Sequence, residues 1–239
     1  GPIMKLRYTS LQLDAGAAEE HRPEVRGTLD GTPVVACTLH SQVAVVAAVL
    51  RHLAPHRRIA YVMTDGAALP LALSDLVHEL RAGGVVDTTV TAGHAFGGDH
   101  EAVSVPSALV VARQLGGADV IVVGMGPGVV GTGSALGTTA VEAAAALDAA
   151  AALGGRPILC PRVSDADERP RHRGTSHHTD TVLRLVRSEV DVPVPAPGDP
   201  DAAAVLDALG LRVTTMGRGP SDDPGFFAAC AAAARAAAT

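Results

Sequence analysis

The stretch Asp119-Val-Ile-Val-Val-Gly-Met-Gly-Pro-Gly-Val-Val-Gly131 decides the fold of this sequence of 239 residues. A short β-branched run leads into a glycine-rich turn, and an alanine-rich run with helical character follows over residues 139–153. A strand-length run that is apolar throughout indicates a strand covered on both faces. The pattern therefore predicts one strand, loop and helix unit of a mostly parallel sheet.

The same alternation recurs along the chain and predicts an α/β fold. Right-handed crossovers join such units into a parallel sheet. We expect a three-layer, doubly wound domain with a mainly parallel sheet and helices on both faces. Strands are expected over residues 33–39, 58–64, 85–92, 119–124, 157–163 and 211–216. Helices are expected over residues 41–53, 70–81, 104–115, 139–153, 176–186, 200–209 and 224–238.

The two ends of the chain are expected to join the same single α/β domain, over residues 1–239. Residues 1–32 are interpreted as an edge strand beginning near Lys5, followed by a polar loop. A proline-rich segment from Val192 separates the last unit, residues 192–239, which is interpreted as two helices around one strand on the same sheet.

Composition excludes several classes of function. Aromatic residues make up 2% of the chain, there is no Trp, and the net charge is -6, so nucleic acid is not an expected partner. No apolar run reaches transmembrane length, which argues against a membrane partner. Cys37, Cys160 and Cys230 form no CxxC pair, and this usage fits a reducing cytoplasm. The alanine-rich helices leave a homo-oligomer open.

Polar and glycine residues follow the expected strands, where the carboxyl ends of a parallel sheet bind ligands. His40, Asp65 and the segments 93–101, 124–133 and 164–178 all occupy such positions. Because these ends share one edge of the sheet, we expect their side chains to converge on one cleft. The candidates for acid-base catalysis are Asp65, Asp99, His177 and His178.

The glycine-rich loop contains the pattern G-x-G-x-x-G, which is typical of dinucleotide sites. Such a loop opens its helix at once, whereas Thr139 and Glu142 are spaced as a capping box that starts the helix later. The sequence therefore argues against NAD and favours a phosphate or carboxylate at the helix start, with a ligand-free connection as the alternative. The expected anion-binding residues are Gly126, Gly128, Gly131, Thr132, Gly133, Thr138 and Arg173.

Histidines concentrate in two loops, at residues 94–101 and 172–180. Imidazole and carboxylate are suitable ligands for zinc, manganese or iron, so a divalent metal is left open as a cofactor. The adjacent His177 and His178 are expected to point in different directions, so that at most one faces a given metal. The alternatives are acid-base catalysis and simple ordering of the loops. The candidate metal ligands are His94, His100 and His178.

A group of arginines surrounds the second histidine loop, and a guanidinium fits phosphate or carboxylate. On an acidic protein, a local basic patch indicates a small anionic molecule as the partner. The alternative is a solvated charge run. These arginines are Arg162, Arg169, Arg171 and Arg173.

Several motifs together resemble a bacterial family known as domain of unknown function 3866. The resemblance implies that the glycine loop, the Phe-Gly-Gly-Asp loop and the Ser-His-His loop are family features. It also implies a small β-rich module ahead of the Lys5 segment, at which the sequence in hand begins. The motifs are Lys5-Leu-Arg-Tyr-Thr-Ser-Leu-Gln, Val62-Met-Thr-Asp-Gly-Ala-Ala-Leu-Pro70, Ala95-Phe-Gly-Gly-Asp-His-Glu-Ala-Val103, Gly126-Pro-Gly-Val-Val-Gly-Thr-Gly133, Arg171-His-Arg-Gly-Thr-Ser-His-His178 and Thr215-Met-Gly-Arg-Gly219.

The sequence as a whole predicts an enzyme that acts on a small anionic metabolite, of which a phosphorylated one is an example. His and Asp acid-base chemistry or metal-assisted hydrolysis or elimination would carry the reaction, with the glycine loop holding the anion. Two alternatives stay open. One is a non-catalytic nucleotide-sensing or interaction module, and the other is an NAD-linked oxidoreductase.

Overall fold

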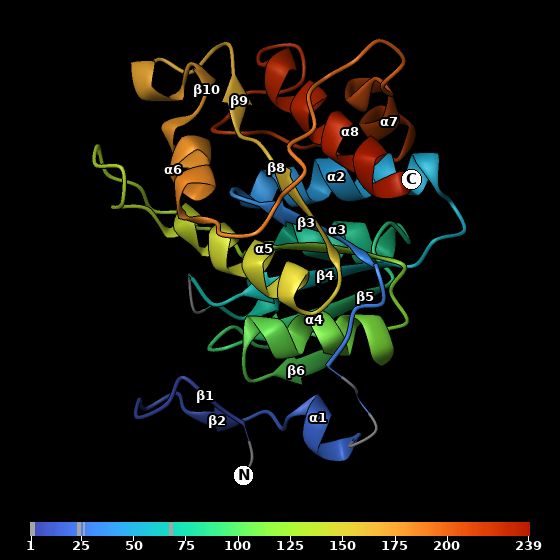
Figure 1. Cartoon of the computed structure of the whole chain (residues 1–239), viewed down its shortest axis with the longest axis vertical. Helices are drawn as coiled ribbons and strands as arrows, with labels where there is room; N and C mark the ends of the chain where they lie inside the picture. Colours follow the sequence, from blue (N-terminus) through green and yellow to red (C-terminus); the bar gives the residue numbers. More distant parts are fainter. Residues whose placement is uncertain (1–2, 23–24, 26, 67–68) are drawn as a thin grey trace.

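A six-stranded parallel sheet forms the centre of the computed structural model, which describes residues 3–22, 25, 27–66 and 69–239 (Figure 1). The strand order is β6-β5-β4-β7-β3-β8, and every neighbouring pair is parallel. Helices cover both faces, which confirms the expected three-layer α/β fold. The strands are β3 (Pro33–Cys37), β4 (Ile59–Thr64), β5 (Thr88–Ala92), β6 (His100–Ala102), β7 (Val120–Met125) and β8 (Arg156–Cys160).

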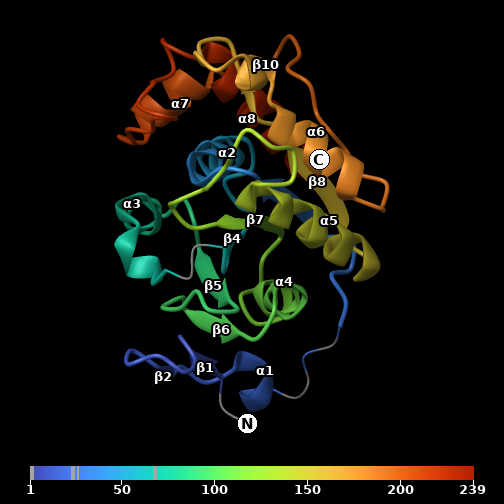
Figure 2. The same cartoon turned by 90° about the vertical axis from the view of Figure 1, so that its left-hand side faces the viewer.

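The helices divide between the two faces of the sheet (Figure 2). One hydrophobic core joins the sheet to α2 (His40–Leu53), α3 (Asp75–Ala82), α7 (Ala202–Ala208) and α8 (Pro224–Ala238). The other core joins it to α4 (Val105–Gln114) and α5 (Glu142–Ala152), with α6 (His177–Leu185) beside α5. Among the helices that the structure describes, none has both the length and the apolar character that crossing a bilayer requires.

Short elements connect these layers. Three are single 3-10 turns, at Leu71–Leu73 (η1), Thr139–Val141 (η2) and Pro170–His172 (η3). The others are β1 (Met4–Lys5), β2 (Leu13–Asp14), α1 (Ala18–His21), β9 (Val163–Ser164) and β10 (Gly174–Thr175).

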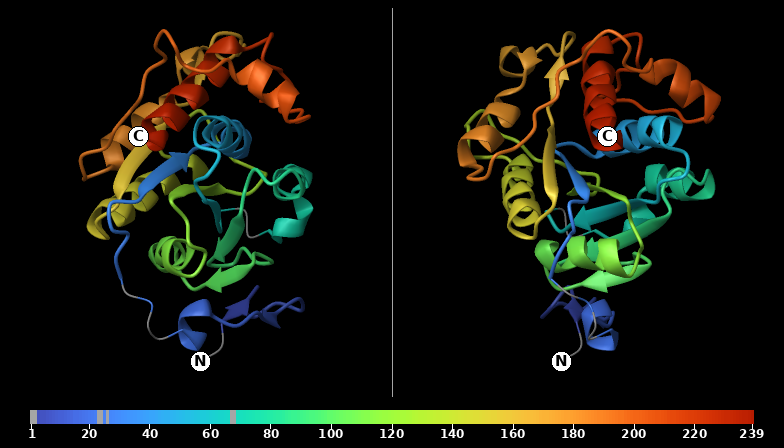
Figure 3. Two further views of the ribbon diagram at one scale, coloured as in Figure 1. Left: turned by 90° about the vertical axis from the view of Figure 1, so that its right-hand side faces the viewer. Right: turned by 45° about the vertical axis from the view of Figure 1, so that its right-hand side comes forward.

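The N-terminal segment differs from its predicted structure. Strand β1 does not join the main sheet but pairs antiparallel with β2, because Leu6 and Tyr8 have φ of 49° and 62° and turn the chain back. The predicted loop that follows includes α1. Lys5 Nζ donates to the Ala102 carbonyl (3.5 Å) and lies 3.2 Å from Glu101. The segment therefore packs beyond β6, at the end of the molecule away from α8 (Figure 3).

The predicted strand over residues 211–216 is wrong, although helices flank it as expected. Met216 and Gly217 have φ of 50° and 80°, so the chain reverses and Thr215 pairs with Arg218 in an isolated bridge. The outer edge of β8 is also occupied, because Leu159 N donates to the carbonyl of Asp191 at 2.9 Å. The last unit therefore contributes helices α7 and α8, not a strand, to the fold.

Candidate functional site

The sheet has a switch point between its neighbouring strands β3 and β7. The helix that follows β3 covers one face and α5, which follows β7, covers the other. Ligands of open α/β sheets bind at such a point, beyond the carboxyl ends of the strands. The cavity here is only about 10 Å³, enough for a single water molecule. It is lined by residues that include Cys37, Thr38, Thr64, Met125 and Glu142.

Glu142 does not form the predicted capping box. The Thr138 hydroxyl instead accepts from Ala140 N (3.2 Å) and caps the 3-10 turn η2, which leads into α5. The Glu142 carboxylate accepts from the Thr64 hydroxyl at 3.0 Å. Burial, opposed by this hydrogen bond and assisted by the charge of Asp65, raises the pKa of Glu142 to about 7. A carboxyl group that exchanges its proton near neutral pH therefore lies beside Asp65.

The first histidine loop lies at the β6 edge and serves to hold that edge together. Asp99 accepts from Thr89 N (2.8 Å) and forms an ion pair with Arg81 (2.9 Å). His94 contacts Arg7, with 3.4 Å between the two nitrogens. Asp99 and His100 line a groove of about 900 Å³ between β6 and the segment that includes β2 and α1.

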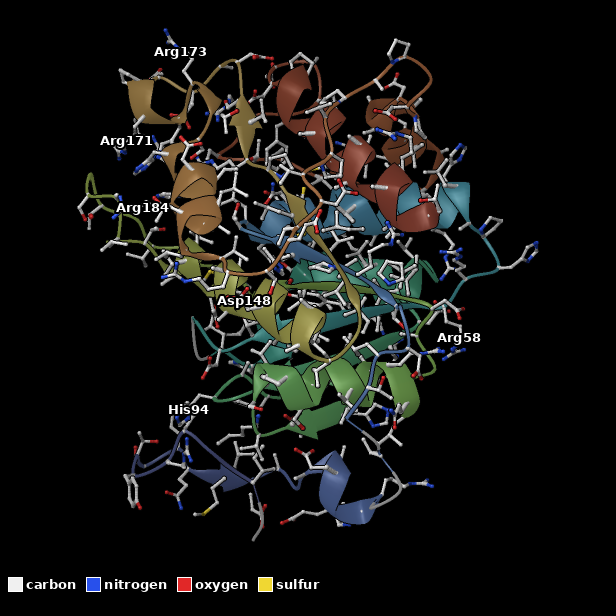
Figure 4. All side chains as sticks on the ribbon, viewed as in Figure 1. Arg58, His94, Asp148, Arg171, Arg173 and Arg184 are labelled. Carbon is white, nitrogen blue, oxygen red and sulfur yellow. The ribbon has the colours of Figure 1, made fainter. Side chains whose placement is uncertain are left out.

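The expected convergence of both histidine loops on one cleft is wrong. Strand β6 is at one edge of the sheet and β8, which leads to the second loop, is at the other. Strands lie about 4.8 Å apart, so these edges are about 24 Å apart. Figure 4 shows His94 near the N-terminal hairpin and Arg171 beside α6 at the other end of the molecule. His94 and His100 therefore do not share a metal with His178.

The second loop gathers His172, His177 and His178 into one cluster. Strands β9 and β10 pair antiparallel, with Ser164 opposite Gly174, and so bring η3 back to the start of α6. The ring centroids lie 4.4 to 4.9 Å apart. The expectation that His177 and His178 diverge is wrong, because the ring of His172 lies within 4.9 Å of both and all three rings meet at the first turn of α6.

The three rings are buried to different extents and share one electrostatic environment. Burial, together with nearby positive groups, lowers the pKa of His172 to about 3 and that of His178 to about 4. The same causes lower the pKa of His177, which is only partly buried. All three imidazoles are therefore uncharged at neutral pH, and each has a ring nitrogen with a free lone pair.

Most of the surrounding arginines are held by buried carboxylates. Asp167 accepts from Arg162 at 3.2 Å and from Arg169 at 2.9 Å, and the bonds from Arg169 hold its pKa well below the usual range. Arg218 lies 3.5 Å from Asp167 and donates to Asp223 at 3.0 Å. Two buried carboxylates therefore offset part of the charge of three guanidinium groups, and the positive charge that remains helps to lower the pKa of the nearby histidines.

Arg171 and Arg173 are exposed and project outward from this region (Figure 4). Arg173 was the arginine among the predicted anion-binding residues, and its Nε donates to the Asp167 carbonyl at 3.3 Å. Arg171 is the exposed cation whose charge, after burial, lowers the pKa of His177. Of the two, Arg171 therefore acts on the imidazole cluster.

The glycine loop is a hairpin that projects beside α6 (Figure 1). Its two arms are joined by Thr132 N, which donates to the Gly137 carbonyl at 2.7 Å, and helix α5 begins only at Glu142. Thr132 and Gly133 are exposed, and Gly126 lies under Met63. The base of the hairpin does reach the histidines, because a Cβ on Gly131 would lie 2.8 Å from His178 Cε1 and 3.4 Å from Thr138 Oγ1.

Fold and site together define an α/β protein with a three-layer parallel sheet and a histidine cluster beyond the carboxyl end of an edge strand. The family described as "Protein of unknown function (DUF3866)" matches residues 1–209, and the chain belongs to this family. No curated protein and no solved structure matches the chain. The family membership confirms the resemblance carried by the motifs.

Proposed function

We propose that this chain is an enzyme that hydrolyses a small anionic metabolite, with phosphate esters as its substrate class. The observation that carries the proposal is the cluster of three uncharged imidazoles at the start of α6, close enough to the exposed guanidinium of Arg171 for its charge to lower the pKa of His177. Uncharged imidazoles handle protons or metal ions, and guanidinium groups bind phosphate. The two chemistries that ester hydrolysis needs are thus side by side.

The exposed guanidinium of Arg171 is the group proposed to receive the anion. The first turn of α6 adds to this preference, because a helix N-terminus carries partial positive charge. In the proposed reaction a water oxygen attacks phosphorus, the bond from phosphorus to the leaving oxygen breaks, and the proton released by the water ends on that oxygen. His177 is the least buried of the three rings and therefore the one nearest to solvent.

The rings alone are weak bases for this task. A general base is most efficient when its pKa lies near the working pH, and those of His172 and His178 lie far below it. The attacking water therefore needs a further source of activation at the same site.

The proposal is tested by incubating the full chain with a panel of small phosphate monoesters and measuring the release of inorganic phosphate. Arg171→Ala is expected to raise KM at least tenfold, because one charge-assisted hydrogen bond contributes about 1.5–3 kcal/mol. Arg184→Ala is the matched control, since Arg184 is an exposed arginine near the end of α6 (Figure 4). No release from any ester, or equal KM in both variants, would contradict the proposal.

A further inference from the structure

We propose that His172, His177 and His178 together bind one divalent transition-metal ion, with zinc as the class of ion that they fit best. This inference deepens the proposed function. Only the role of the metal in ester hydrolysis rests on that function. The metal site itself stands on the geometry of the three imidazoles.

The first argument is the convergence of the donor atoms. Each histidine offers one ring nitrogen, and the three nitrogens all lie within 4.8 Å of one another. Within the part of the chain that the structure describes, no other group of three His, Cys, Asp or Glu side chains meets this criterion. Tetrahedral zinc with bonds of about 2.1 Å needs nitrogens about 3.4 Å apart, so each ring has to close in by less than about 1 Å.

The second argument is a set of buried nitrogens without a partner. Among the described residues, His177 Nε2 and both ring nitrogens of His178 are buried and make no hydrogen bond. Leaving such groups unpaired destabilises a fold, and native proteins rarely do so. A metal ion bound to one nitrogen of each ring removes most of this cost.

The third argument is the support behind His172. Its Nδ1 lies 2.7 Å from the hydroxyl of Ser176, which leaves Nε2 as the ring nitrogen available to a metal ion. Ligand histidines typically hold their second nitrogen in such a bond, which fixes the orientation of the ring. Ser176 also accepts from His178 N at 3.2 Å and caps α6. One buried hydroxyl thus positions ligands on both sides of the cluster.

The arginines around the cluster oppose a cation, and a buried carboxylate offsets part of their charge. Arg162 and Arg169 both point at Asp167, so their charge is opposed by a buried carboxylate. Three neutral histidines leave the full charge of the ion, and one coordination position stays free for water or an anion. A bound ion lowers the pKa of its water towards neutrality, which is the activation that the weakly basic rings do not supply.

The experiment measures metal binding directly on the full chain after treatment with a chelator. We expect titration calorimetry with zinc chloride to give one ion per chain, and cobalt chloride to give the visible bands of a four-coordinate ion. His178→Gln is expected to weaken zinc binding more than about 100-fold, because even supporting residues of a metal ligand account for 10- to 100-fold. His94→Asn is the matched control, as His94 is a partly buried histidine at the other edge of the sheet.

Circular dichroism confirms that each variant is folded before its affinity is compared. Absence of zinc binding by the folded chain, or unchanged affinity in His178→Gln, would overturn the inference. Zinc binding without ester hydrolysis would leave the metal site standing and remove the proposed function. Ester hydrolysis by the metal-free chain would leave the proposed function standing and remove the catalytic role proposed for the metal.

Discussion

Replacing Glu142 by Gln tests whether the raised pKa of Glu142, beside Asp65 at the switch point, lowers the stability of the fold above pH 4.5. The Glu142 carboxyl accepts from Thr64 and lies beside Asp65, and burial raises its pKa from 4.5 to about 7. Below pH 4.5 the group is neutral in both the folded and the unfolded chain. Between pH 4.5 and 7 the unfolded chain releases this proton while the folded chain keeps it, so the free energy of unfolding decreases over that window.

The magnitude follows from the same pKa values. A rise from 4.5 to about 7 sets an upper bound of about 3.4 kcal/mol on the cost of charging Glu142 in the folded protein. Because the carboxyl group is partly exposed and screened by solvent, we expect a cost of about 1–2 kcal/mol. Gln keeps a carbonyl oxygen for the Thr64 hydroxyl and carries no charge. Glu142→Gln should therefore be more stable than the natural chain by about this amount at pH 8 and equally stable at pH 4.

The assay is urea unfolding followed by circular dichroism at a series of pH values from 4 to 8. Glu79→Gln serves as the control, since Glu79 is an exposed glutamate on α3. Its unfolding free energy should follow that of the natural chain at every pH. If Glu142→Gln showed the same pH dependence as the natural chain, the raised pKa and the argument built on it would be wrong.

Two further substitutions probe the histidine site. Asp167→Asn leaves Arg162, which is 4% exposed, without its charged partner. We expect urea titration to show that the free energy of unfolding falls by about 3–5 kcal/mol. A fall of less than about 1 kcal/mol would contradict this reasoning. Gly131→Ala places a Cβ 2.8 Å from His178 Cε1 and should weaken cobalt binding at least tenfold. Gly133→Ala meets no atom within 4 Å and should bind cobalt as the natural chain does, so equal losses in both variants would argue against the contact.

The main sheet could be predicted because its strands are continuous apolar runs. Residues 120–125 and 156–160, for example, are strands almost as expected. Strand β6 escaped prediction because its three residues, His100–Ala102, form a strand only by pairing with β5. Residues 211–216 have strand-like composition, but Met216 turns the chain and residue Asp191 already occupies the outer edge of β8.

The candidate site was predicted in part. The rule that polar groups gather at the carboxyl ends of strands led to the loop of His177 and His178, but the order of the strands cannot be read from their alternation. That order separates His94 and His100 from the second loop. His172 joins the cluster only through the pairing of β9 with β10, a contact that helical or strand periodicity does not encode.

Glu142 and Arg171 illustrate two further limits of sequence reasoning. The spacing of Thr139 and Glu142 is that of a capping box, but the chain enters the helix through the 3-10 turn η2 and so moves the cap to Thr138. The glutamate is then available to face Asp65. Arg171 and Arg173 both stood in the predicted basic patch. The structure places Arg171 in η3, where its charge lowers the pKa of His177.

Helix α8 has a consequence for where this fold can be divided. The family likeness ends at residue 209, yet Phe226, Phe227 and the alanines of α8 share one core with α2. Shortening the chain to residues 1–209 would expose the apolar surface of α2 that α8 covers, and exposed apolar patches promote aggregation. Helix α8 thus shields the hydrophobic core from solvent, and any fragment of this protein made for study has to retain it.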